Sequence, residues 1–105
     1  MFAVKAKRRK TAADLVVTGE LVFENVKEFA EVFRTVLDKP RIFLDLTGLD
    51  RVDLAGLQVL FAAQSGSSRL GYELELKLGE NAARIEKITR FAGLRMLQES
   101  STNES

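Results

Sequence analysis

Three carboxylates close together in the chain, those of Asp45, Asp50 and Asp53, are the groups best suited to chemistry. Carboxylate oxygens around one turn could hold a magnesium ion together with water. Each aspartate also has a structural role open to it. Asp45 can end a strand, Asp50 can form a turn, and Asp53 can cap a helix that follows. These structural roles need no ion, so the sequence predicts no metal site.

Hydroxyl groups gather at Ser65, Ser67 and Ser68, around Gly66, but the chain lacks the residues that would activate them. It contains no histidine and no cysteine, which excludes Ser-His-Asp triads, thiolate nucleophiles and zinc sites built on those ligands. Neither a Gly-x-x-x-x-Gly-Lys-Ser/Thr phosphate loop nor a Gly-x-Gly-x-x-Gly dinucleotide motif occurs. The sequence therefore indicates a protein that is not an enzyme and that needs no cofactor.

Length and composition favour one small domain. The chain has 105 residues, of which 46% are hydrophobic, enough for one two-layer core. Residues 1–97 are predicted to form this domain, and residues 98–105 are predicted to be disordered because they offer nothing to bury. No apolar run reaches the about 18 residues that a bilayer crossing needs, and no signal peptide is recognisable. Together with the absence of cysteine, these features favour a cytoplasmic location.

A cluster of basic residues lies near the start of the chain: Lys5, Lys7, Arg8, Arg9 and Lys10. Apolar and basic residues alternate over 2–7, and this favours an edge strand whose outward lysines discourage aggregation. Binding of an anionic partner such as nucleic acid is the less favoured alternative. No nucleic acid partner is therefore expected.

Periodicity in the first half of the chain predicts two strands, a helix and a third strand. The first strands are expected at 2–7 and 15–17, the second of them ended by Thr18 and Gly19, and they could pair as a hairpin. A helix is expected from Val26 to Lys39, with Asn25 as its cap and Pro40 as its end. Three consecutive apolar residues at 42–44 are typical of a strand covered on both faces.

The second half predicts a long helix from Leu54 to Leu70, capped by Asp53 and ended by Gly71. Alternation over 72–78 predicts a half-exposed strand, joined to 42–44 by a right-handed crossover and therefore parallel to it. A last helix is expected at 81–92, closed by Gly93, with the apolar residues of 94–97 packed beneath it. One stripe of the long helix is expected to face solvent or a partner: Ala55, Gln58, Ala62, Ser65 and Arg69.

Four short motifs then stand in a recognisable order. They are Gly19-Glu20-Leu21, Asp45-Leu46-Thr47-Gly48-Leu49, Val52-Asp53-Leu54-Ala55-Gly56-Leu57 and Arg90-Phe91-Ala92-Gly93-Leu94. Together they resemble the STAS domain of bacterial anti-sigma factor antagonists over about residues 12–97, although Val22 departs from the family's aspartate. The resemblance implies an α/β fold with a four- to five-stranded mixed sheet and helices packed mainly on one side. It also implies a binding module rather than an enzyme.

The resemblance further implies where a partner docks and how docking is switched. In well-understood members, an Asp-Ser-Ser-Gly-Leu or Asp-Ser-Ala-Gly-Leu segment docks a serine kinase that doubles as an anti-sigma factor, and phosphorylation there exchanges partners. Asp53, Gly56 and Leu57 match this segment, whereas Leu54 and Ala55 replace its hydroxyl positions. No phosphorylation is therefore expected at the usual site. The Asp-Leu-Ala-Gly-Leu-Gln version resembles a subgroup associated with chemotaxis and signalling gene clusters.

The leading hypothesis is a protein-binding module of bacterial signal transduction or transcription regulation, whose partner is a kinase-like anti-sigma factor or a chemotaxis protein. A monomer or weak dimer is expected. The predicted partner-binding residues are Asp53, Leu54, Ala55, Gly56, Gln58, Ala62 and Thr47, the last in a turn from Thr47 to Arg51. A structural alternative is that Leu54 and Ala55 only pack against the sheet. A functional alternative is an accessory subunit linked to nucleotide or lipid transport.

Overall fold

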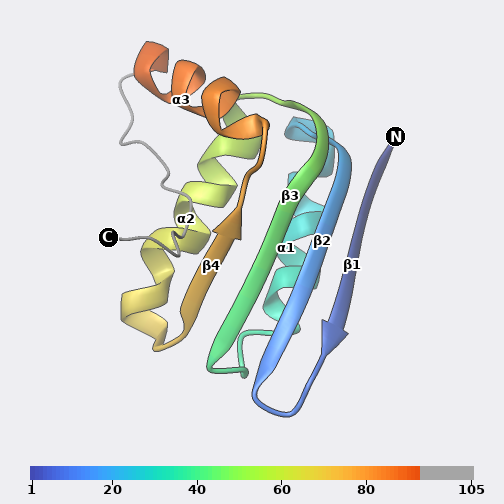
Figure 1. The fold of residues 1–105 in the computed structure, drawn as a ribbon, viewed down its shortest axis with the longest axis vertical. Coiled ribbons are helices and arrows are strands. Elements are labelled where there is room, and N and C mark those ends of the chain that lie inside the picture. Colours follow the sequence, from blue (N-terminus) through green and yellow to red (C-terminus); the bar gives the residue numbers. More distant parts are fainter. Residues whose placement is uncertain (93–105) are drawn as a thin grey trace.

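The computed structural model describes the backbone of residues 1–92 and the side chains as far as Lys87. The elements follow in the order β1 (Phe2–Arg8), β2 (Ala12–Leu21), the short 3-10 helix η1 (Phe23–Asn25), α1 (Val26–Arg34), β3 (Arg41–Val52), α2 (Leu54–Leu70), β4 (Glu73–Lys77) and α3 (Asn81–Ala92). One four-stranded sheet has the order β1-β2-β3-β4, with β1 antiparallel to β2 and the other neighbours parallel (Figure 1). This arrangement confirms the predicted α/β class with a mixed sheet.

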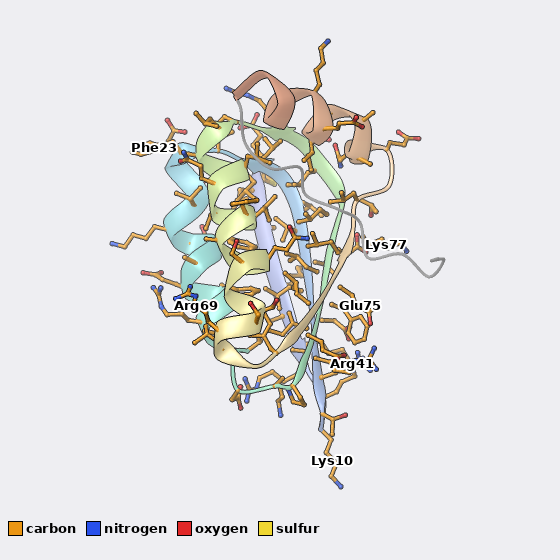
Figure 2. All side chains as sticks on the ribbon, turned by 90° about the vertical axis from the view of Figure 1, so that its left-hand side faces the viewer. Lys10, Phe23, Arg41, Arg69, Glu75 and Lys77 are labelled. Carbon is orange, nitrogen blue, oxygen red and sulfur yellow. The ribbon has the colours of Figure 1, made fainter. Side chains whose placement is uncertain are left out.

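Helices α1 and α2 cover one face of the sheet, and α3 lies at the end of the sheet where α2 begins (Figures 1 and 2). The core lies between this helical layer and the alternate residues of the central strands. On β3, Ile42, Leu44 and Leu46 are buried and point into it, while Phe43 lies on the opposite face and is only half-buried. The prediction that 42–44 is covered on both faces is therefore wrong.

The largest difference from the sequence prediction lies in β3, which runs twelve residues without the turn expected at Thr47–Arg51. Its register against β2 shifts twice, because Val16 and Thr18 pair with Asp45 and Gly48, and further on Gly19 and Glu20 pair with Leu49 and Arg51. Each shift places one extra residue on β3, which is the geometry of a bulge. Buried positions accordingly change from every second to every third residue: Ile42, Leu44, Leu46, Leu49 and Val52.

Strand β2 also continues past its predicted end at Gly19, as far as Leu21. Gly19 has a φ of 86° and lies at one of the register shifts, so it bends the strand instead of ending it. A side chain could not replace its hydrogen, because a Cβ would come within 1.5 Å of the Met1 carbonyl oxygen. Glycine is common both at bends within strands and at turns that end strands, so the sequence around Gly19 does not distinguish the two.

Helix α1 ends at Arg34, five residues before the predicted end at Lys39. Beyond it the amides of Thr35, Val36 and Leu37 bond three residues back, a tighter winding that brings Val36 fully into the core. The predicted cap is also wrong. The Asn25 side chain does not accept from the helix but donates from Nδ2 to the Glu20 carbonyl oxygen at 2.7 Å.

The predicted bounds of α2 and α3 are confirmed, and Gly71 ends α2 in the left-handed conformation, with φ at 83°. Ile85 of α3 is buried as expected. The predictions for Gly93, for Leu94, Met96 and Leu97, and for a disordered tail at 98–105 lie outside the described residues. None of the helices in the described part of the chain combines the length and hydropathy that a bilayer crossing requires.

Candidate partner-docking site at the start of helix α2

Asp53 joins two backbone segments at the point where β3 passes into α2. Its Oδ1 accepts from the Gly56 amide at 2.9 Å, which confirms the predicted helix cap, and its Oδ2 accepts from the Phe23 amide at 3.0 Å. The second hydrogen bond ties η1 to the first turn of α2. Because a carboxylate of the chain already occupies this helix start, a phosphate or nucleotide placed there would meet a negative charge.

Gly56 allows the first turn of α2 to lie directly against the end of β2. A Cβ on this residue would come within 2.0 Å of the Leu21 carbonyl oxygen and 2.9 Å of Val52 Cγ2. The next residue, Leu57, is fully buried in the core. The match of Gly56 and Leu57 to the family motif therefore has a packing reason, and the start of α2 is held rigidly on the sheet.

The side chains predicted to meet a partner lie mostly at the surface of α2. Leu54 is 46% exposed, Gln58 and Ala62 are exposed, and Ala55 is half-buried. Ser65 and Arg69 continue the same stripe and are exposed as well. Leu54 therefore does not simply pack against the sheet, and the structural alternative fails for this residue. Asp53 and Gly56 belong to the scaffold beneath the surface, because their contacts are with the backbone of β2 and η1.

Phe23 is an exposed aromatic residue of this region that the sequence analysis did not single out. It is 71% exposed, lies in η1, and is held beside α2 by the bond from its amide to Asp53 (Figure 2). The preceding Val22 is buried, so the adjacent Phe23 is turned away from the core. The sequence contained a signal for this exposure, because two consecutive large apolar residues at the end of a strand covered on one face cannot both face inward.

Thr47 lies apart from the α2 surface. Its backbone amide and its Oγ1 both donate to Asp45 Oδ1, at 2.9 and 2.7 Å. Asp45 pairs with Lys77 of β4 and alternates with buried Leu44 and Leu46, so it faces away from the helices. The structure thus brings Leu54, Ala55, Gln58 and Ala62 together on one helix and leaves Thr47 on the other face of the sheet.

The Asp45–Thr47 contact also sets the charge of the Asp45 carboxyl. Burial would raise its pKa, but the hydrogen bonds from Thr47, together with the nearby Lys77, outweigh burial, and the pKa of Asp45 lies below its usual value. The carboxylate is therefore ionised at neutral pH, and its Oδ1 holds Thr47.

The three aspartates that suggested a magnesium site do not converge. Because β3 is extended from Arg41 to Val52, at about 3.3 Å per residue, Asp45 within it is well separated from Asp53, the residue that follows the strand. Asp45 binds Thr47 and Asp53 caps α2, while Asp50 is exposed between them. Within the described residues, no three carboxylates gather in a way that could hold a metal ion.

Two residues of α3 donate hydrogen bonds to the C-terminal part of β3, beyond the last residue that pairs with β4. Asn81 Nδ2 donates to the Leu46 carbonyl oxygen at 2.9 Å, and Arg84 Nη1 donates to that of Asp50 at 2.5 Å. Asn81 is only 5% exposed, and this bond satisfies its buried amide. The sequence showed Asn81 only as a helix start, because a contact across 35 residues leaves no local pattern.

Comparison with known families decides the relationship of this fold. Residues 4–99 match the family model described as "Mlab, STAS domain". The chain belongs to the STAS domain family. No curated protein sequence matches the chain.

Solved structures agree with this assignment. An anti-sigma factor antagonist from Mycobacterium paratuberculosis is similar with a TM-score of 0.72 and 15% identity, covering 89% of this chain and 79% of that one. The unphosphorylated anti-sigma factor antagonist SpoIIAA is similar with a TM-score of 0.65 and 16% identity, covering 91% and 88%.

A third similar structure, of Mglu, has a TM-score of 0.66 and 17% identity over 72% of this chain. The present chain spans only 19% of that protein's length. At these identities the three likenesses show the fold, and this STAS domain resembles the anti-sigma factor antagonists in its architecture.

Proposed function

We propose that this STAS domain is a non-catalytic docking module that binds a protein partner through the surface at the start of α2. The docking surface consists of Phe23, Leu54, Ala55, Gln58 and Ala62, with Asp53 and Gly56 holding it in place. The partner is a signalling protein, such as a kinase-like anti-sigma factor or a chemotaxis protein. The single observation that carries the proposal is the pair of exposed apolar side chains, Phe23 of η1 and Leu54 of α2, on two segments that Asp53 ties together.

Apolar side chains on a fixed backbone favour binding, because little backbone freedom is lost when a partner covers them. The backbone of Phe23 is held by the hydrogen bond from its amide to Asp53, and Leu54 is the first residue of a capped helix whose Gly56 packs on β2. Aromatic residues of this kind are common at the centre of protein interfaces. The surface therefore has the composition of a docking site and needs no rearrangement to form one.

The proposed docking is not switched by a phosphate on the domain itself. Leu54 and Ala55 have no hydroxyl group. A phosphate on Thr47 would replace a donated hydrogen bond by repulsion from Asp45, whose oxygen lies 2.7 Å from Thr47 Oγ1. Phosphates on Ser65, Ser67 or Ser68 would lie near the negative end of the α2 dipole. Any regulation therefore belongs to the partner.

Affinity capture tests the proposal with variants on the same helix. Ala55→Arg places a long charged side chain on the docking surface, whereas Ser68→Arg makes the same change at an exposed position near the far end of α2. The tagged proteins are incubated with lysate of the source cells, and the captured proteins are quantified by mass spectrometry. We expect one partner that the wild type and Ser68→Arg retain equally and that Ala55→Arg loses by at least about tenfold.

Equal retention of that partner by Ala55→Arg would place its binding elsewhere on the domain and contradict the proposed surface. Stoichiometric phosphate on Thr47 or on any of the three serines of α2 would contradict the unswitched mode. Both readings come from the same mass spectra.

The description of the matching family model, "Mlab, STAS domain", does not name the anti-sigma factor antagonists. We therefore keep a second candidate, an accessory subunit linked to nucleotide or lipid transport. Calorimetry with ATP and GTP tests whether the second candidate, in its nucleotide-linked form, applies instead of the first. Because Asp53 already fills the start of α2, we expect no heat of binding at up to millimolar nucleotide. A micromolar dissociation constant would favour a nucleotide-linked role instead.

A further inference from the structure

A groove of about 190 Å³ lies between α1 and α2, below the docking surface. Four small residues line it, Ala30 of α1 and Ala62, Ala63 and Gly66 of α2, and their short side chains leave the space open. Phe29, Phe33 and Tyr72 form its aromatic floor, and the first two rings stack with their centroids 5.8 Å apart. The Tyr72 hydroxyl donates to the Ala63 carbonyl oxygen, so its polar group is already paired within the protein and the rings supply the apolar surface of the floor.

Two arginines and no acidic residue line this groove. Arg34 comes from the last turn of α1 and is exposed. Arg69 comes from the last turn of α2 and is exposed as well (Figure 2). In the part of the chain that the structure describes, neither guanidinium forms an ion pair with a carboxylate. This differs from Arg8, Arg9, Arg41 and Arg51, each of which faces an acidic side chain within 4 Å.

The size of the groove limits what can fill it. An apolar cavity of about 150 Å³ holds one benzene molecule, so a space of 190 Å³ suits a single aromatic or branched aliphatic side chain. A whole lipid chain would extend far beyond it. Amphipathic helices are commonly recognised by grooves that take the apolar anchor side chains of one helical face, and a groove of this size has room for one such anchor.

We propose that the groove takes one large apolar side chain from an acidic amphipathic segment of the partner protein, whose carboxylates pair with Arg34 and Arg69. Charge complementarity identifies the occupant, since two unpaired guanidinium groups at the rim of an apolar groove favour anions beside the inserted side chain. Ala62 belongs both to the docking surface and to the groove, so one partner can cover both. In naming the partner's chemistry, the inference rests on the proposed function.

A pair of synthetic peptides tests the groove without the unidentified partner. Both carry Leu and Phe along one helical face; one has Glu at the remaining positions and the other has Lys. Each is titrated into the isotopically labelled protein while amide chemical shifts are followed by NMR. We expect the Glu peptide to shift the amides of Ala30, Ala62 and Gly66 saturably, and to bind at least about tenfold more tightly than the Lys peptide.

Charge reversal then assigns this preference to the two arginines. Arg34→Glu combined with Arg69→Glu should lower the affinity for the Glu peptide by about tenfold or more and remove its advantage over the Lys peptide. Lys10→Glu combined with Lys27→Glu changes the net charge equally at exposed positions that do not line the groove. This matched control should leave the preference in place.

Three results would overturn the inference: no saturable shifts of the groove amides with the Glu peptide, equal affinity for both peptides, or equal losses in the arginine and lysine variants. This peptide test can be told apart from the test of the proposed function. Ala55 does not line the groove, so the Ala55→Arg variant should still bind the Glu peptide. If Ala55→Arg retained the captured partner, the docking surface would be contradicted but the groove proposal would not. If the peptides did not bind as expected, the groove proposal would be contradicted but the docking surface would not.

Discussion

At the scale of single residues, Asp53 has the largest structural role in the site, because its two oxygens hold α2 and η1 together. Replacement by alanine leaves both amides without this acceptor. We expect Asp53→Ala to lower the free energy of unfolding by about 1–2 kcal/mol, the usual cost of a lost helix cap. Asp53→Asn keeps one oxygen acceptor and should lose less. Urea denaturation followed by circular dichroism measures both changes.

Asp50→Ala is the matched control for Asp53. It removes the same charge from an exposed side chain three residues away, and Asp50 contributes its backbone carbonyl, not its carboxylate, to Arg84. Its effect should stay within about 0.5 kcal/mol. Equal losses in Asp53→Ala and Asp50→Ala would mean that general charge, and not the two hydrogen bonds, stabilises the start of α2.

Residue chemistry also separates what the sequence could predict in the site from what it could not. The role of Asp53 as a cap was predictable because capping is local, and the amide of Gly56 lies only three residues away. The second bond, to Phe23, crosses thirty residues and depends on where β2 ends. Thr47 was misplaced for a related reason, since its surroundings depend on the β3 bulges and not on its neighbours in sequence.

At the scale of elements, the helices were predicted well where their ends have local signals and poorly where packing decides. The cap at Asp53 and the left-handed Gly71 give α2 its bounds. Helix α1 ended early because burial of Val36 required a tighter turn before Pro40 was reached. Strand β3 was divided in the prediction because Thr47-Gly48-Leu49-Asp50 has turn-forming residues, whereas nine backbone partners on β2 keep it extended.

Arg8 joins the end of the edge strand β1 to the segment that follows α1. Arg8 donates to both carboxylate oxygens of Asp38, at 3.1 and 2.9 Å, and also to the carbonyl oxygen of Thr35 just beyond α1. The hydrogen bond from Arg8 is the main reason why the pKa of Asp38 lies below its usual value. This pairing therefore joins the end of β1 to the loop that precedes β3.

The lowered pKa of Asp38 predicts how the fastening of β1 depends on pH. A carboxyl whose pKa is lower in the folded than in the unfolded protein stabilises the fold above its unfolded pKa, and loses this effect as pH falls through the folded value. Protection of the β1 amides from hydrogen exchange should therefore weaken below about pH 4. Because both side chains are well exposed, the effect should be local to β1.

Hydrogen exchange at neutral and at acid pH, after correction for the intrinsic pH dependence, measures this effect in Arg8→Ala. The variant should show faster exchange in β1 at neutral pH and little further loss of protection in acid, while β3 is unchanged. Lys5→Ala, which removes a positive charge from the same strand, should behave like the wild type. An acid-dependent loss of the same size in Arg8→Ala would show that Asp38 is not its source.

At the scale of the whole molecule, the fold pairs the two arginines of the basic start of the chain with carboxylates. Arg8 pairs with Asp38, and Arg9 pairs with Asp14 at 2.9 Å while its guanidinium lies 5.4 Å from the centre of the Phe43 ring. On the same open face, Arg41 pairs with Glu73 and Glu75 of β4 (Figure 2). The sequence showed a run of cations, and the fold shows that the carboxylates paired with the two arginines come from β2 and from the segment between α1 and β3.

This charge arrangement predicts weak binding of nucleic acid. Three lysines of the cluster, Lys5, Lys7 and Lys10, are exposed without an ion pair in the described part of the chain. Each phosphate contact contributes about 0.9 to the slope of log affinity against log salt, so duplex DNA should give a slope no steeper than about −3. We expect no binding tighter than about 10⁻⁴ M at physiological salt in a fluorescence anisotropy titration. A micromolar constant there, with a steeper slope, would mean that Arg8 and Arg9 leave their carboxylates for phosphate, and that the open face of the sheet is a second binding surface opposite the helices.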